Sequence, residues 1–237
     1  MAAMAMVSEH TCITFHRRNS TELDYVLFRP GKGYVDFSTR FGHGYGASCR
    51  VLANSFKMPT PPTEHVLNPT CSGESWVQIL SNNMSVCHLS PLSCASNVGF
   101  FGGRQFVYVA PSCSVGNIAH EILHTLGFEH EHTRLDRDGF IEIIKSNIIK
   151  GMEENFKKLA GKTFDIPYDY SSILHYGRTF FSSNGKPTII PKKDIKDMGQ
   201  RSRLTETDRK KITLLYNCGA VAPAGNTEPS LISIFPF

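Results

Sequence analysis

The sequence lacks several features that mark common protein classes. No apolar stretch approaches the length of a membrane-spanning helix, so no membrane partner is expected. No run of lysine or arginine occurs, and the formal net charge of +4 is mild, so no nucleic-acid partner is expected either. Residues 1–7 are apolar but have neither a basic start nor a clear cleavage region, so they do not indicate a secretory signal.

Paired C-x-x-C spacing, which is typical of cysteine zinc sites, is also missing from the seven cysteines. Their scatter favours disulfides, and hence an oxidising compartment, over a cysteine metal site. Because the number is odd, at least one thiol has no partner within the chain. The disulfide-like pattern conflicts with the lack of a visible signal. Either the chain is incomplete at its N-terminus or its cysteines are reduced.

What the sequence does contain is a dense histidine motif. His120 and His124 are four residues apart and therefore share one face of a helix, where both imidazoles can bind one metal ion. Gly127 can end this helix in a left-handed conformation, so that His130 returns to the same metal. Glu121 stands beside the ligands and can act on the attacking water. Chance agreement at these five positions is on the order of one in ten thousand, so the motif predicts a Zn²⁺ site.

Short runs of β-branched and aromatic residues predict two strands of one sheet at 12–15 and 24–28, and a further strand at 106–110. The last of these would form an edge of the cleft above the metal, where an extended peptide can add to it. Residues 34–93 show no sustained period, and we interpret them as a disordered insertion. Residues 219–237 have three prolines and no periodicity, and we interpret them as a flexible tail behind a folded domain of residues 1–218.

Three helices are expected. The zinc helix should run over about 117–126 and be buried on both sides of the ligands. Residues 146–158 carry an apolar stripe and predict a second helix. Thr205 and Asp208 can cap a last helix that ends at about residue 217.

The histidine motif, followed directly by Glu131, resembles the astacin family of metzincin zinc peptidases. Residues 127–138 are similar to its fish hatching-enzyme branch, and residues 172–177 look like the family's Met-turn. The resemblance implies an α+β fold of two subdomains, with a twisted mixed sheet, a long zinc-binding helix and an irregular C-terminal subdomain. It also implies a secreted monomeric endopeptidase that hydrolyses peptide bonds of extracellular proteins.

In that family pattern three histidines (His120, His124 and His130) hold the zinc. Glu121 is the general base, and Tyr176 is a fifth ligand in the resting enzyme that supports the transition state. An alternative stays open, because the short start and the insertion could prevent a stable sheet. The chain would then be a zinc-binding but inactive isoform or an interaction protein.

The resemblance also pairs cysteines, namely Cys12 with Cys218 and Cys94 with Cys113. The other three cysteines fall in the insertion, as Cys49, Cys71 and Cys87. In the family a Gly-x-Gly motif runs directly into the cysteine that Cys94 matches. Residues 34–93 therefore have no counterpart, and our hypothesis is that they are extra sequence translated from an unspliced intron.

Two further departures from the family lead to expectations. Leu174 stands where the family has the methionine that packs beneath the metal, and a leucine of similar volume should be tolerated. The start of the chain shows no counterpart of the family's first helix and first strand. Glu131 would then lose its amino-terminal partner and be buried without compensation, which is costly.

Overall fold

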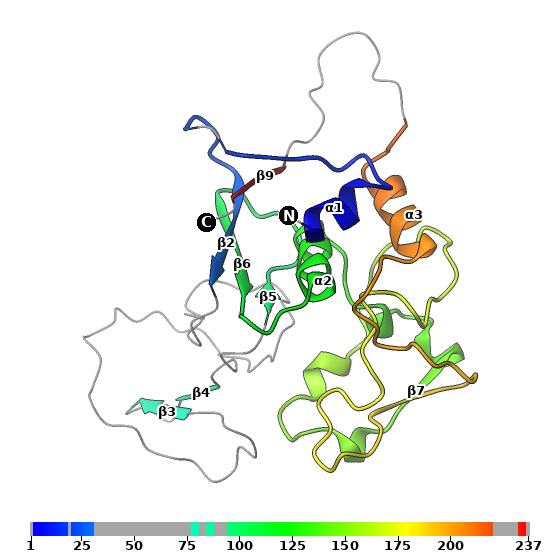
Figure 1. The fold of residues 1–237 in the computed structure, drawn as a ribbon. Helices are drawn as coiled ribbons and strands as arrows, with labels where there is room; N and C mark the ends of the chain where they lie inside the picture. The colour runs from blue at the N-terminus through cyan, green and yellow to red at the C-terminus, as the bar shows by residue number, and fades with distance from the viewer. Residues whose placement is uncertain are drawn as a thin grey trace.

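The computed structural model describes residues 2–18, 20–30, 77–80, 84–87, 94–219 and 232–235. Five strands within these ranges form one mixed sheet in the order β1-β9-β2-β6-β5 (Figure 1). They are β1 (Phe15–His16), β2 (Tyr25–Pro30), β5 (Ala95–Ser96), β6 (Arg104–Val109) and β9 (Ile232–Phe235). Neighbouring strands are parallel except β5, which pairs antiparallel with β6. A separate antiparallel pair is made by β3 (Val77–Leu80) and β4 (Met84–Cys87).

The sheet confirms two predicted strands and corrects other expectations. The strands expected at 24–28 and 106–110 are β2 and β6, whereas the run at 12–15 contributes only its last residue to β1. The prediction that 106–110 forms the edge is wrong, because β5 pairs outside β6 through Ala95 and Ser96. Four residues of the predicted tail form β9. Most of the predicted insertion and tail lies outside the described residues, so the domain boundaries stay a prediction.

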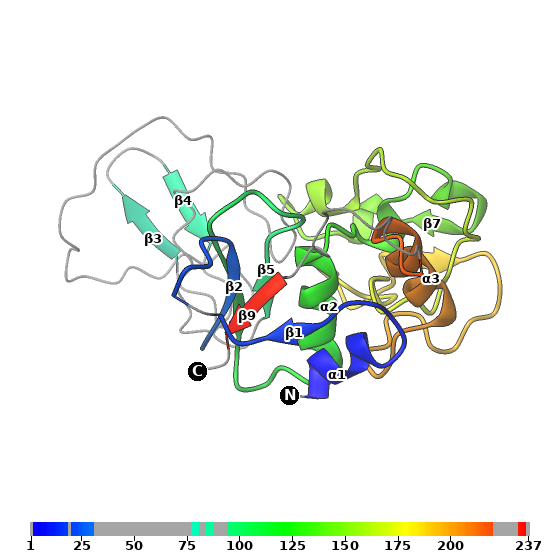
Figure 2. The same ribbon diagram turned by 90° about the horizontal axis from the view of Figure 1, so that it is seen from above.

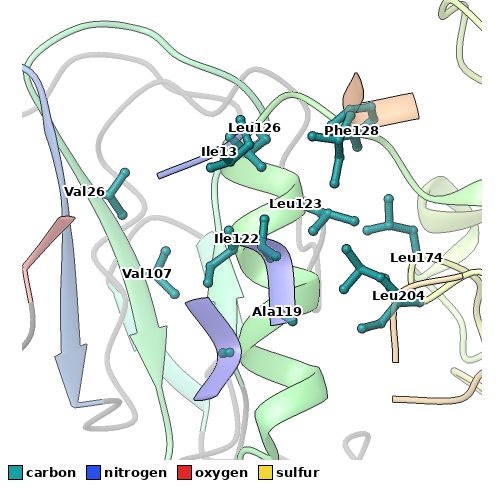
Figure 3. Close-up of a cluster of buried hydrophobic side chains, with 14 of the residues drawn as sticks. Ile13, Val26, Val107, Ala119, Ile122, Leu123, Leu126, Phe128, Leu174 and Leu204 are labelled. Carbon is teal, nitrogen blue, oxygen red and sulfur yellow. The ribbon is translucent and has the colours of Figure 1, made fainter. Parts of the chain in front are cut away.

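The first core lies on both sides of α2 (Val115–Thr125). Figure 3 shows Val26 and Val107 of the sheet facing Ile122, while Leu123 points the other way, towards Leu174. Both faces of the helix are therefore covered, as predicted for a zinc helix that is apolar on both sides.

Residues 2–8 form a helix, α1 (Ala2–Ser8), although the start of the chain showed no counterpart of a first helix. Ala3 and Val7 are buried in the core, and α1 packs on α2 (Figure 2). No helix in the described ranges is long and apolar enough to cross a membrane.

The chain after α2 forms a second, mostly irregular part of the fold. Its elements are η1 (Glu131–Thr133), η2 (Arg137–Gly139), β7 (Ile141–Ile143), η3 (Lys145–Asn147), η4 (Glu153–Phe156), β8 (Ile189–Pro191) and α3 (Glu206–Leu215). A second apolar cluster fills this part, with Ile141, Phe156, Tyr168 and Ile189 among its buried members. The predicted α+β fold, with two subdomains, a mixed sheet and an irregular C-terminal subdomain, is confirmed.

The helix predicted over 146–158 is wrong. The stretch forms two short 3₁₀ helices, η3 and η4, separated by Gly151 at a φ of 91°. Its local hydrogen bonds span three residues, as from the N–H of Met152 to the carbonyl of Ile149, and Ile149 donates its own N–H to the distant carbonyl of Phe181 at 2.9 Å. Ile148 and Phe156 are buried as the stripe predicts, but by tertiary packing.

Candidate active site

Three buried histidines converge on one point. The Nε2 atom of His124 lies 3.0 Å from that of His120 and 3.2 Å from that of His130, and the third pair is 3.3 Å apart. Three nitrogens that bind zinc tetrahedrally at its usual bond length are about 3.3 Å from one another. The spacing of the triad therefore fits a zinc ion, and these histidines form the zinc-binding triad.

Hydrogen bonds to the Nδ1 atoms of two of these rings orient them so that their Nε2 atoms point to the centre of the triad. His120 Nδ1 donates to the carbonyl of Ile173, and His124 Nδ1 donates to the carbonyl of Phe128, both at 2.7 Å. A carbonyl only accepts, so each Nδ1 carries the hydrogen and each Nε2 keeps its lone pair for a metal. Burial lowers the pKa of His124 to about 4, which keeps its ring neutral and able to ligate.

Local sequence explains how the chain builds this triad. Ser114 caps the start of α2, where its side chain accepts a hydrogen bond from the N–H of Asn117. Gly127 has a φ of 94°, which confirms the left-handed turn predicted from its position. The turn ends the helix and brings His130 back beside His124.

Glu121 lies next to the triad and is buried, with 5% of its surface exposed. Its Oε2 accepts a hydrogen bond from Ser96 Oγ at 2.7 Å, so the edge strand β5 contacts the expected base. Burial raises the pKa of Glu121 to about 7, against the opposing effects of the Ser96 hydrogen bond and the Arg201 cation. A dication held by the neighbouring triad would lower this pKa again.

Tyr176 lies against the triad. Its ring centroid is 4.5 Å from that of His130 in an edge-on arrangement, and it stacks on His132 at 3.9 Å. The predicted proximity to the metal site is therefore present. Its role as a fifth ligand stays a prediction.

The expectation that Glu131 is buried without compensation is wrong. Its Oε2 accepts a hydrogen bond from the ammonium of Lys211. Its Oε1 accepts from Arg134 Nη1 and from the N–H of Asp169, both at 3.0 Å. Two cations and a backbone donor thus surround this carboxylate, and Lys211 ties α3 to the segment that carries the third ligand.

Both disulfides that the resemblance implied are present, joining Cys12 to Cys218 and Cys94 to Cys113. The second holds β5 to the loop that leads into α2. The side chains of the three other cysteines, in the predicted insertion, lie outside the described residues.

Asp208 supports the site in a way that its predicted capping role did not suggest. It completes the expected capping box with Thr205 at the start of α3. Its carboxylate also accepts hydrogen bonds from Ser172 Oγ at 2.6 Å and from the N–H of Ile173 at 3.0 Å. Since the carbonyl of Ile173 orients His120, Asp208 fixes a metal ligand through one intermediate residue.

Arg201 is a half-buried cation near the site that no sequence pattern indicated. Its Nη1 donates to the carbonyl of His175 at 3.0 Å. Desolvation lowers its pKa to about 10, opposed by the nearby carboxylates of Glu121 and Asp208. The chain passes so close to α2 here that a Cβ on Gly116 would lie 1.7 Å from the Arg201 carbonyl oxygen.

A mixed sheet, a central helix with two histidine ligands and an acid, and a third histidine beyond a glycine turn form the arrangement that the resemblance to metzincin zinc peptidases implied. A family model described as "Astacin", a peptidase family, matches residues 63–217, more than half of the chain. The chain belongs to the astacin family. The match begins inside the stretch that we interpret as an insertion.

Relatives and a solved structure agree with this assignment. The zinc metalloproteinase nas-14 of Caenorhabditis elegans is 52% identical over 131 residues, which are 53% of this chain and 26% of the relative. The low choriolytic enzyme of Oryzias latipes is 40% identical over 58% of this chain and 52% of its own length. The structure of high choriolytic enzyme 1 from the same fish, a hatching enzyme zinc-protease, matches with a TM-score of 0.63 and 29% identity. That match covers 91% of this chain and 80% of the other. The chain thus spans only part of the curated relatives that it matches.

Proposed function

We propose that this chain is a zinc-dependent endopeptidase. The observation that carries the proposal is the joint placement of the histidine triad and Glu121 beside an edge strand. The triad supplies three neutral nitrogen ligands, which in zinc enzymes leave a fourth position for water or substrate. The edge strand β5 offers backbone groups to which an extended peptide can add.

Each residue of the site has a defined task in this reaction. Bound zinc would polarise the scissile carbonyl and lower the pKa of the attacking water. Glu121 takes the proton from that water and passes it to the leaving amine. Ser96 holds the Glu121 carboxylate in place through its 2.7 Å hydrogen bond. The ring of Tyr176 packs against His130, and we propose that Tyr176 would support the developing negative charge and would be a fifth zinc ligand in the resting enzyme.

The substrate is a protein or peptide, and we propose that it is extracellular. Two disulfides within the described residues support an oxidising compartment, and hence secretion. We further propose that the chain acts as a monomer.

The competing hypothesis is a zinc-binding chain without activity. It depends on the short start and the insertion, which could prevent a stable sheet. Within the described ranges the sheet has five strands, α1 covers α2, and Glu131 is compensated, all of which favour the active form.

The Glu121→Ala variant separates the proposed roles. It should abolish hydrolysis of casein while one zinc per chain is retained, because Glu121 is a base and not a ligand. Zinc content is measured by atomic absorption on the same sample. Retained hydrolysis would refute the general-base role, and loss of zinc would show that Glu121 is structural.

A further inference from the structure

One exposed aromatic side chain lies beside the metal site. Five aromatic rings in the described part of the chain contact the ring of Tyr176, and one of them belongs to the ligand His130. Phe180 is the exposed one among the five, with 38% of its surface accessible, whereas Tyr176 is 4% exposed. The ring centroids of Phe180 and Tyr176 are 5.1 Å apart. Phe180 therefore extends a row of rings from the metal ligand to the solvent.

The backbone next to Phe180 is strained. A single exposed phenylalanine is common on protein surfaces and by itself indicates no site. Phe181, however, has a φ of 55°, a left-handed conformation that a bulky side chain rarely adopts. Such strain persists only where the surrounding contacts impose it, and it is typical of ligand sites. At this turn the two consecutive phenylalanines separate, because Phe181 packs against the second apolar cluster while Phe180 is exposed.

Hydrogen bonds fix the backbone that carries the exposed ring. The N–H of Phe180 donates to the carbonyl of Gly177 at 3.3 Å, and its own carbonyl accepts from the hydroxyl of the buried Thr188 at 2.7 Å. A Cβ on Gly177 would lie 2.9 Å from the Phe180 ring, so the ring rests directly on the residue that follows Tyr176. The position of this ring relative to Tyr176 is therefore determined by the fold.

The cation next to this ring already has partners. The guanidinium carbon of Arg201 lies over the face of the Phe180 ring, 5.7 Å from its centre. Its Nη1 also donates to the carbonyls of His175 and Gln200, at 3.0 Å and 2.9 Å. Arg201 is half-buried, whereas the Phe180 ring is exposed. We therefore expect this place to bind an apolar side chain in preference to an acidic one.

A peptide bound at the metal site can reach the ring. Tyr176 lies between His130 and Phe180, with centroid distances of 4.5 Å and 5.1 Å. One residue of an extended peptide spans about 3.3–3.6 Å, so a side chain one or two residues from the cleaved bond covers this distance. An apolar side chain that packs on Phe180 removes the exposed surface of both groups from water, which favours binding.

We propose that Phe180 is a specificity-determining residue, whose exposed ring binds an aromatic or large aliphatic side chain of the substrate next to the cleaved bond. The chain thus cleaves preferentially beside such side chains, and Phe180 takes no part in the chemical step. This inference rests on the proposed peptidase function, because it concerns the choice of the peptide bond.

Three quenched fluorescent peptides test the preference. One has alanine on both sides of the cleaved bond, and each of the others has phenylalanine on one of the two sides. For the zinc-loaded chain we expect kcat/KM to be about ten-fold higher for one phenylalanine peptide than for the alanine peptide. In Phe180→Ala this ratio should fall below about two-fold, because the apolar surface is removed. Phe180→Tyr retains the ring and should retain the ratio.

The matched control is Leu214→Ala, which removes an exposed apolar side chain from α3 and should leave the activity and the ratio unchanged. The proposal is overturned if the parent shows no preference for phenylalanine, if Phe180→Ala keeps it, or if Leu214→Ala loses it equally. A stronger preference for aspartate in a fourth peptide would also overturn it and assign the selection to Arg201.

Thermal melts and zinc content show whether the variants keep the fold, which is expected because Phe180 is exposed. Phe180→Gln is a second variant that keeps a long side chain over Gly177 but removes the apolar ring. It should lose the preference as Phe180→Ala does, so the test does not depend on one variant.

Binding without cleavage separates this proposal from the proposed function. The same peptides, labelled with fluorescein alone, are titrated with the zinc-loaded Glu121→Ala chain and followed by fluorescence anisotropy. One phenylalanine peptide should bind about ten-fold more tightly than the alanine peptide, and adding Phe180→Ala should abolish the difference. Equal binding of the peptides would contradict the role of Phe180. If the parent cleaves no peptide, the peptidase assignment fails, and the anisotropy result still decides whether Phe180 binds the apolar side chain.

Discussion

Lys211 on α3 donates its ammonium to the carboxylate of Glu131, the residue that directly follows the third metal ligand. Both side chains are buried, with 9% and 3% of their surfaces exposed. The ion pair joins the last helix to the centre of the molecule across 80 residues of sequence. Glu131 also receives the N–H of Asp169, so one carboxylate connects three segments around the site.

Replacing Lys211 by methionine should destabilise the chain by about 3 kcal/mol, because it leaves a buried carboxylate with one cation fewer. Urea unfolding followed by circular dichroism measures the loss. Lys210→Met is the control, because Lys210 is exposed and pairs with Glu206 at the surface, and it should cost under about 0.5 kcal/mol. Equal losses in the two variants would contradict the structural role of the buried pair.

Gly116 should not tolerate alanine. In an ordinary helix the change gains up to about 1 kcal/mol. Here the new Cβ would lie 1.7 Å from the carbonyl oxygen of Arg201, so backbone must move, and we expect a net loss of about 1–3 kcal/mol in unfolding free energy. Gly161→Ala meets no atom within 4 Å and should be nearly neutral. A Gly116→Ala chain as stable as the parent would refute the close approach.

Leu174 should accept the methionine that the family has at this position. It is 1% exposed and packs in the core cluster that contains Leu123 and Leu204. The swap conserves volume, so we expect a change of less than about 1.5 kcal/mol and unchanged zinc content. Leu174→Ala, by contrast, should cost about 2–5 kcal/mol through the cavity that it leaves. Zinc loss in the methionine variant alone would show that the metal site depends on this side chain.

Removing the Ser96 hydroxyl should shift the pH dependence of catalysis. The Ser96 hydrogen bond lowers the pKa of Glu121, so Ser96→Ala raises it. A base works when deprotonated, so the acidic limb of kcat/KM should move to higher pH in the variant. Ser183→Ala, at an exposed serine bonded to the carbonyl of Asn147, should leave the limb in place. An unmoved limb in Ser96→Ala, or one moved to lower pH, would contradict this positioning of Glu121.

How far the sequence predicted the structure depends on the range of the interactions involved. The triad and its glycine turn were predictable because His120, His124, Gly127 and His130 are set by one helix and the turn after it. The capping box of Thr205 and Asp208 was predictable for the same reason.

Contacts between residues that are far apart in the sequence could not be predicted. Lys211 is one of several lysines near the C-terminus, and nothing local distinguishes it from Lys210 before the fold places it beside Glu131. The apolar stripe at 146–158 predicts a helix, but the stretch turns at Gly151, which has a φ of 91°, and Ile149 bonds to the distant Phe181. Strand β9 pairs in a parallel register between β1 and β2, a placement that no short pattern encodes.

The most direct test of the central claim is hydrolysis of a quenched fluorescent peptide by the purified chain before and after zinc removal. We expect cleavage by the zinc-loaded chain, loss of cleavage with a chelator, and recovery when one equivalent of zinc is added back. A folded chain that binds one zinc through its three histidines and cleaves neither this peptide nor casein would contradict the account.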